Sequence, residues 1–241
     1  MIHKDTQFDM SGIYSGVQAR FREINNLAEW VPCAAHSLNL VGSSAVECCS
    51  AAVNYFGIVQ SVYTFFSASP QRWSKFKERM KENTFVLQGL SETRWSARSD
   101  ACKAFYANYI EIRQALSLSD VTESERQTPP AVPEANSLIK RMDHFETALM
   151  CVIWKDLLQK IDIVNKALQE PGIELCTIIK LYDSLITRFH DARSKFVMFE
   201  SMAKISHNPI TKNVHNANEC ESDLVLLEYY LSHKPYTSTD Q

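Results

Sequence analysis

The longest apolar segment of this sequence runs from Ala34 to Phe66 and contains one charged side chain, that of Glu47. Its apolar residues recur every three or four positions, at Leu38, Val41, Ala45, Cys48, Ala52, Phe56, Val59, Val62 and Phe66. That spacing is typical of an α-helix, and a helix that is apolar on most of its faces is normally buried. The segment therefore predicts one long central helix on which the rest of the fold packs.

Composition favours a mainly α fold. Only 6 of the 241 residues are glycine, which leaves few tight turns, and 45% are hydrophobic, which is enough for a sizeable core. The formal net charge of -3 argues against a dedicated DNA-binding domain, because such domains are usually basic. No run of about 18 apolar residues predicts a membrane span. The seven irregularly spaced cysteines, and a first segment without the apolar run of a secretory signal, predict free thiols in a reducing compartment.

Other elements follow from the same periodicity. Helices are predicted over residues 12–25, 71–83, 96–116, 145–168 and 175–199. The last two should form an antiparallel hairpin, because only a short break at Pro171-Gly172 separates them. Short apolar runs predict strands at 29–32 and 84–88.

Four regions are predicted along the chain. Residues 1–116 form a first region and residues 138–205 a second, helical one. Between them, residues 117–137 are rich in Ser, Thr, Glu and Pro and predict a linker. Pro129, Pro130 and Pro133 argue against a regular helix there. Residues 206–241 predict a weakly ordered tail.

Three short motifs contain the residues that could carry chemistry. Cys33 and His36 are two of the four ligands that structural zinc needs, and no second pair follows at a suitable spacing, so we predict no metal site. A helix-start histidine beside a small buried cysteine is the alternative interpretation. Asp5 is a single carboxylate, which is either a metal ligand of a larger site or a solvated terminal residue.

The third motif is Thr93-Arg94-Trp95, followed one turn later by Arg98. A guanidinium suits phosphate oxygens, and an indole can stack on a base, so Arg94, Trp95 and Arg98 are candidate nucleic-acid contacts. The alternative is a tryptophan packed in the core. The basic run 72–81 likewise could contact phosphate or form a solvated, salt-bridged surface, because Glu78 lies within it.

In this order, Asp5, Cys33-x-x-His36 and Thr93-Arg94-Trp95 resemble the transposase core of the hAT superfamily, in the branch that includes the zinc finger MYM-type proteins. The resemblance implies an RNase H-like core interrupted by an all-α insertion, which would correspond to residues 138–200. It also implies a nuclear location, and a cytoplasmic location is the alternative. Asp5 would hold Mg²⁺ or Mn²⁺, Cys33 and His36 would lie near the scissile phosphate, and Trp95 would stack on a flipped base.

The departures from that family are as informative as the matches. Two-metal phosphoryl chemistry needs several converging carboxylates, and only Asp5 matches one. Glu200 and Glu228 lie in no recognisable motif, and we expect the strands that precede Asp5 in the family to be missing. The sequence therefore predicts a mainly α fold with an incomplete RNase H-like α/β core and a few short strands, followed by an all-α helical hairpin.

We expect a catalytically inactive fragment that needs no cofactor. Such a fragment could bind DNA weakly, bind a protein partner or form an oligomer. Two alternatives stay open. The chain could be part of an active metal-dependent DNA transposase, or a helical interaction scaffold with no role in nucleic-acid binding.

Overall fold

The computed structural model describes residues 16–27, 32–47, 49–80, 85–91, 95–117 and 131–207, and this part of the chain is mainly α-helical, as predicted. No strand occurs within these ranges. The helices are α2 (Val17–Ile24), α3 (Ala34–Glu47), α4 (Ser50–Ser67), α5 (Pro70–Arg79), α6 (Trp95–Ala107), α7 (Tyr109–Ala115), α9 (Ala131–Met142), α10 (Phe145–Ala167), α11 (Leu175–Ser194) and α12 (Phe196–His207). None of the described helices is long and apolar enough to cross a membrane.

The chain forms two compact units, residues 1–37 and residues 38–241. In the first unit, α2 confirms the helix predicted over 12–25 for its described part. Its apolar residues Val17, Phe21 and Ile24 recur at helical spacing, and all three are exposed. The linker predicted at 117–137 falls inside the second unit, which contains helices from both sides of it.

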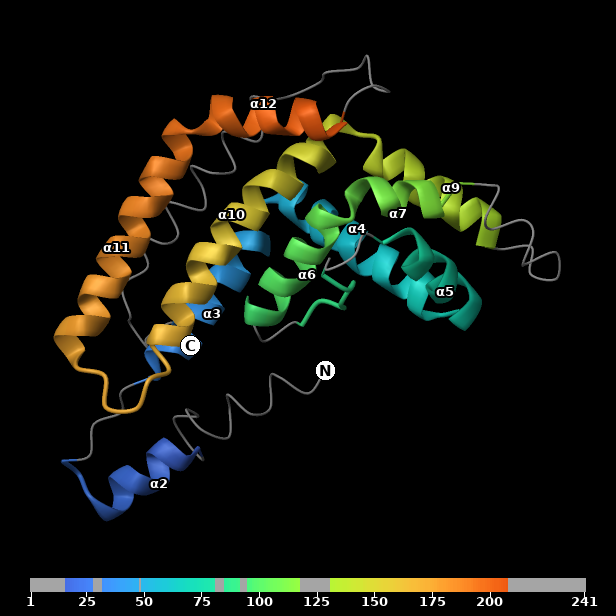
Figure 1. The fold of residues 1–241 in the computed structure, drawn as a ribbon. Helices are drawn as coiled ribbons and strands as arrows, with labels where there is room; N and C mark the ends of the chain where they lie inside the picture. The colour runs from blue at the N-terminus through green and yellow to red at the C-terminus, as the bar shows by residue number, and fades with distance from the viewer. Residues whose placement is uncertain are drawn as a thin grey trace. The chain divides into compact units, whose positions relative to one another are not determined.

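The centre of the second unit is α10. This helix packs most extensively on α6 and α12, and also on α11, α4 and α9 (Figure 1). Leu149, Ile153 and Leu157 on it are almost completely buried. The expectation that the segment 34–66 would be the hub is therefore wrong, because α10 is the helix that contacts neighbours on most of its faces.

The segment 34–66 is also not one helix. α3 ends at Glu47, and α4 begins at Ser50 after Cys49, whose backbone is extended (φ -112°, ψ 107°). The thiol of Cys49 accepts a hydrogen bond from the amide of Ala52 at 3.2 Å and so caps α4. No glycine or proline marks this break, and apolar periodicity continues across it, so the sequence pattern predicted a continuous helix.

A second break divides the helix predicted over 96–116. α6 and α7 meet at the buried Asn108, which leaves the helical conformation (φ -111°, ψ 18°). Its side-chain amide donates to the carbonyl of Ala104 at 2.8 Å and to that of Phe85 at 2.7 Å. An asparagine side chain can hydrogen-bond to nearby backbone carbonyls in place of the helical backbone bonds, and for this reason asparagine often interrupts a helix.

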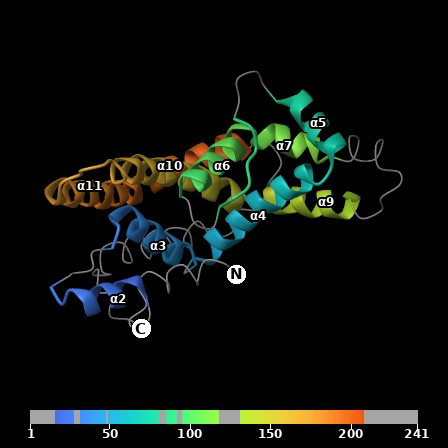
Figure 2. The same cartoon turned by 90° about the horizontal axis from the view of Figure 1, so that it is seen from below.

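The strand predicted at 84–88 is wrong for residues 85–88. The segment 85–91 runs along α6 without a neighbouring strand in the described part of the chain (Figures 1 and 2). Side chains hold it instead. Asn108 binds the carbonyl of Phe85, and the side-chain carbonyl of Gln60 accepts the amide hydrogen of Leu90 at 2.8 Å. Of the strand predicted at 29–32, only residue 32 is described, and it is not in a strand.

Pro133 of the predicted linker does not prevent a helix, and Pro129 and Pro130 lie outside the described residues. α9 begins at Ala131 and has Pro133 as its third residue. Proline is tolerated in the first turn of a helix, because the amide hydrogens there have no partner within the helix. Pro70 is likewise tolerated at the first position of α5, where the hydroxyl of Ser69 accepts the amide hydrogen of Arg72 and caps the helix.

The predicted hairpin is present, with one change. α10 and α11 are antiparallel neighbours joined through Gly172, whose φ of 77° suits glycine (Figure 1). The second predicted helix is interrupted at Lys195, after which α12 packs back on α10 (Figure 1). The predicted hairpin is therefore a group of three helices, in which α11 and α12 both pack on the long helix α10.

The central position of α10 predicts a contrast between two isoleucines on it. Ile153 is 1% exposed and Ile163 is 55% exposed. Ile153→Ala should lower the free energy of unfolding by about 2–5 kcal/mol, because it leaves a cavity. Ile163→Ala should change it by less than about 0.5 kcal/mol, since a surface substitution removes little packing. Urea unfolding measures both, and similar losses for the two variants would contradict a central α10.

Candidate functional site

The Cys33–His36 motif lies at the start of α3. Cys33 precedes the helix and its carbonyl accepts the amide hydrogen of Ser37 at 2.9 Å. Cys33 and His36 are both exposed, so the alternative in which Cys33 is a buried apolar group is wrong. In the described part of the chain, no group of three or more His, Cys, Asp or Glu side chains could hold a metal ion.

Trp95 is the first residue of α6 and is 2% exposed. Its indole nitrogen donates to the carbonyl of Asn39 at 2.9 Å. Its ring lies against Gly42, where an added Cβ would be 2.5 Å from the ring carbon Cζ2. The end of the Cys33–Gly42 segment and the start of α6 are therefore packed together through one indole, although more than fifty residues separate them in sequence.

An aromatic ring and a cation also lie against Trp95. Trp154 of α10 stacks on it, with ring centroids 6.5 Å apart, and the Arg98 guanidinium lies 5.1 Å from the Trp95 ring centroid. The same guanidinium lies 5.4 Å from the ring of Phe56, and its Nε donates to the carbonyl of Ser91 at 3.0 Å. Arg98 therefore joins α4, α6 and the segment 85–91.

This geometry decides between the two interpretations of Trp95. A base can stack only on an exposed ring face, and this indole is buried in protein. Trp95 thus acts as a core residue that positions α3 against α6. Of the other candidate residues, Asp5 and Arg94 lie outside the described residues.

The residues that receive Trp95 were not among the predicted site residues. Asn39 contributes only a backbone carbonyl, which no sequence pattern distinguishes. Gly42 did have a signal, since a glycine inside an apolar helical pattern often marks a close approach of another group. For Trp154, no sequence signal beyond its position in a helical pattern indicated a contact with Trp95.

A separate buried group lies where α4, α6 and α10 meet. The hydroxyl of Tyr55 lies beside the thiols of Cys102 and Cys151, and all three residues are at most 1% exposed. Burial raises the pKa of the Cys102 thiol to about 12, although Tyr55 and Arg98 act in the opposite direction. Burial also raises the pKa values of Cys151 and Tyr55. These groups therefore stay protonated at neutral pH and act as apolar packing groups.

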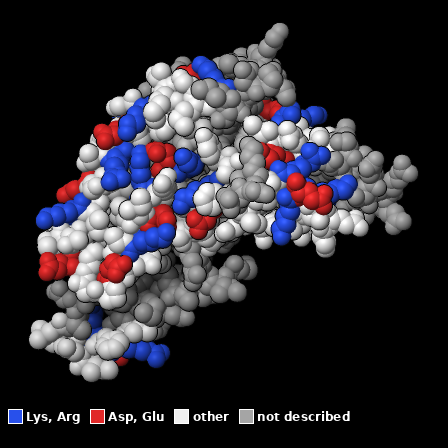
Figure 3. All heavy atoms as spheres, viewed as in Figure 1, with Lys and Arg blue, Asp and Glu red and all other residues white. Residues whose placement is uncertain are grey.

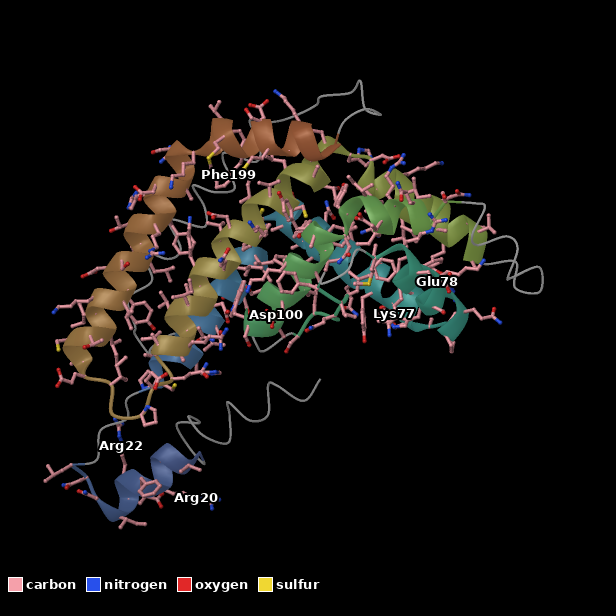
Figure 4. The ribbon with its side chains drawn as sticks, viewed as in Figure 1. Arg20, Arg22, Lys77, Glu78, Asp100 and Phe199 are labelled. Atoms are coloured by element: carbon pink, nitrogen blue, oxygen red, sulfur yellow. The ribbon has the colours of Figure 1, made fainter. Side chains whose placement is uncertain are left out.

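The basic run forms the exposed side of α5. Lys77, Glu78 and Arg79 are exposed, and Figure 4 shows Lys77 and Glu78 on this helix. The Lys77 ammonium lies 6.0 Å from the ring centroid of Trp73, whose edge contacts the ring of Tyr63. Basic and acidic side chains are intermixed on this face (Figure 3). The exposed side of α5 therefore combines cations with half-exposed aromatic rings, and Glu78 keeps its positive charge moderate.

Comparison of the chain with models of protein families, with curated proteins and with solved structures finds no match.

The packing of Trp95 on Gly42 predicts that Gly42→Ala lowers the free energy of unfolding by about 1–3 kcal/mol, because the added methyl group overlaps the indole. Gly57→Ala in α4 is the matched control. Its Cβ would meet nothing closer than the Arg141 guanidinium at 3.6 Å, so the better helix propensity of alanine should stabilise the protein by roughly 0.5–1 kcal/mol. Urea unfolding measures both changes. Equal effects of the two substitutions would show that the Gly42 contact is loose.

The buried thiols predict selective labelling and alkaline instability. An aromatic disulfide reagent should label the exposed Cys33 and Cys176 in the native chain, and Cys102 and Cys151 only after unfolding, as peptide mapping by mass spectrometry would show. Cys102 ionises at its ordinary value of 9.0 when unfolded and near 12 when folded. Its contribution to stability is therefore complete below pH 9 and is lost as the pH rises from 9 to 12. This fall should be smaller in Cys102→Ala, and rapid native labelling of Cys102 would contradict its burial.

Proposed function

We propose that this chain is a catalytically inactive module derived from a transposase of the hAT type. In this proposal, residues 1–116 are a reduced remnant of the RNase H-like core and residues 138–205 are the helical insertion. The order of the motifs at Asp5, Cys33–His36 and Arg94–Trp95 is its basis in the sequence. The observation that supports it most is the packing of Trp95 on Asn39 and Gly42, because it joins two motif segments that are distant in the chain.

The proposed inactivity rests on the number of carboxylates with a match in the family. Paired metal ions need several acidic ligands around them, and Asp5 alone cannot supply these. Glu200, which lies in no recognisable motif, is on α12 with its carboxylate 2.7 Å from the Lys204 ammonium. It belongs to no group of three or more His, Cys, Asp or Glu side chains that could hold a metal ion in the described part of the chain.

A nucleic-acid contact, in this proposal, belongs to α5. Trp95 is buried and Arg98 is held by protein groups, whereas α5 carries exposed cations, of which Lys77 lies over the ring of Trp73. Phosphate neutralisation by a few cations gives weak, salt-dependent binding without sequence preference. Glu78 reduces the local positive potential, which is consistent with weak binding. The same proposal places the protein in the nucleus, as the resemblance implies.

A helical scaffold without any nucleic-acid role is the competing function. The intermixed charges on the surface in Figure 3 and the net charge of -3 favour it. The two functions differ in one measurable property, since counterion release makes nucleic-acid binding depend on salt, whereas a scaffold gives no such response.

The proposal predicts weak binding of the full chain to a fluorescent DNA duplex, with an affinity that falls as salt increases. Lys77→Gln should weaken binding at low salt and lower the salt slope by about one, because one phosphate contact is lost. Lys195→Gln, which removes an exposed lysine at the far end of α11, should leave the slope unchanged. Binding that does not respond to salt would exclude the nucleic-acid role and favour the scaffold.

A cleavage assay separates the inactive module from an active transposase subunit. The wild-type chain and Asp5→Ala are incubated with supercoiled DNA and Mg²⁺ or Mn²⁺. We expect no strand cleavage by either. Metal-dependent nicking that disappears in Asp5→Ala would show that the chain is a nuclease and would overturn the proposed inactivity.

A further inference from the structure

Phe85 carries an exposed aromatic ring at the start of the segment 85–91. The ring-bearing side chain is 60% exposed, whereas every other phenylalanine that the structure describes in the second unit is buried. The next residue, Val86, is 45% exposed. Transfer of such a ring from water to an apolar surface is favourable, so Phe85 can contact a ligand that offers a flat apolar face.

The backbone that carries this ring is held at both ends. The carbonyl of Phe85 accepts a hydrogen bond from the side-chain amide of Asn108 at 2.7 Å, and the amide of Leu90 donates to the side-chain carbonyl of Gln60 at 2.8 Å. Between them, Leu87 is 4% exposed and anchors the segment beside α6 (Figure 2). Little backbone freedom remains to be lost on binding, so the segment is preorganised for a ligand.

Tyr63 of α4 connects this segment to α5. A Cβ on Gly89 would lie 3.0 Å from Cε1 of Tyr63, so the backbone of the segment lies directly against the tyrosine ring. The same ring makes an edge contact with Trp73, with centroids 6.2 Å apart, and the Lys77 ammonium lies 6.0 Å from the Trp73 centroid. The four residues from Phe85 to Gly89 can span at most about 14 Å. One short ligand can therefore reach both the exposed ring and the cations of α5.

The charges and rings of this surface suit a particular class of ligand. α5 carries four basic side chains and one acidic side chain, and the segment 85–91 carries no charge. Cations that follow a phosphate backbone, together with aromatic rings on which bases stack, are the features that bind single-stranded nucleic acid. In a duplex the bases are stacked inside the helix and present only their edges in the grooves, so they cannot cover an exposed ring.

We propose that α5 and the segment 85–91 form a binding site for single-stranded nucleic acid, in which the cations of α5 contact phosphates and an unpaired base stacks on Phe85. This inference rests on the nucleic-acid role proposed above for α5 and adds the class of nucleic acid. An acidic peptide would satisfy the same cations. The exposed ring favours nucleic acid, because every base has a planar face that can stack on it.

The test is fluorescence anisotropy of the full chain with a labelled oligothymidylate of about 12 nucleotides, an oligouridylate of the same length and a duplex of the same length. At one salt concentration, a single strand should bind about 5- to 100-fold more tightly than the duplex, which is the range that one stacked base provides. Preference for either the DNA or the RNA strand over the duplex supports the proposal. Phe85→Ala should remove the preference and leave the duplex affinity and its salt dependence unchanged, because no charge is lost.

Matched variants separate stacking from other effects of the substitution. Phe21→Ala is the control, since Phe21 on α2 is 61% exposed but belongs to the first unit, and it should bind like the wild type. Phe85→Trp should keep the preference for a single strand. Phe85→Leu should lose it, because leucine is apolar but has no planar ring.

The possible failures are distinguishable. Salt-dependent binding with equal affinity for single strand and duplex would overturn the single-strand site and leave the proposed role of α5 intact. Binding of neither, or binding without salt dependence, would overturn the role of α5 and this site with it. A preference retained in Phe85→Leu would overturn the stacking contact. Displacement by an oligoglutamate peptide as efficient as displacement by unlabelled oligothymidylate of equal charge would show that any polyanion binds, and would also overturn the proposal.

Discussion

The burial of α10 is the constraint on which the second unit depends. Fifteen of its 23 residues are buried, so the helix must be covered by several partners at once. One of those residues is Asp162, whose carboxylate lies 2.8 Å from the Lys166 ammonium and 4.0 Å from that of Lys103 on α6. A buried carboxylate is costly unless it is paired, and Lys103 therefore also helps to set the position of α6 along α10.

Trp95 connects this core to α3. Its stacking on Trp154 places it on α10, and its hydrogen bond to Asn39 and contact with Gly42 bring in the helix that follows the Cys33–His36 motif. Trp95, whose residue type made it a candidate for stacking on a base, is here a structural element of the core. Any contact with nucleic acid would therefore have to come from another surface.

Several features of the fold could be predicted from local pattern. Capping by Ser69 and the position of Pro70 predict where α4 ends and α5 begins. The turn residues Pro171-Gly172 predict the break after α10, and the loss of apolar periodicity predicts the end of α12. The break at Cys49 could not, because its cause is an extended backbone and a thiol cap, with no glycine or proline to mark it. Asn108 interrupts a helix through a contact with Phe85, which lies far from it in sequence.

The sequence by itself determined that the described chain is helical, and roughly where most of its helices lie, because helical periodicity and capping act over a few neighbouring residues. Only the tertiary structure decided that α10, and not the more apolar segment 34–66, lies at the centre. Hydrophobicity shows that a helix should be buried, but the number of neighbours that cover it depends on all the helices together. Tertiary packing also decided whether Trp95 faces a ligand or the core, because an indole suits both environments and only its contacts distinguish them.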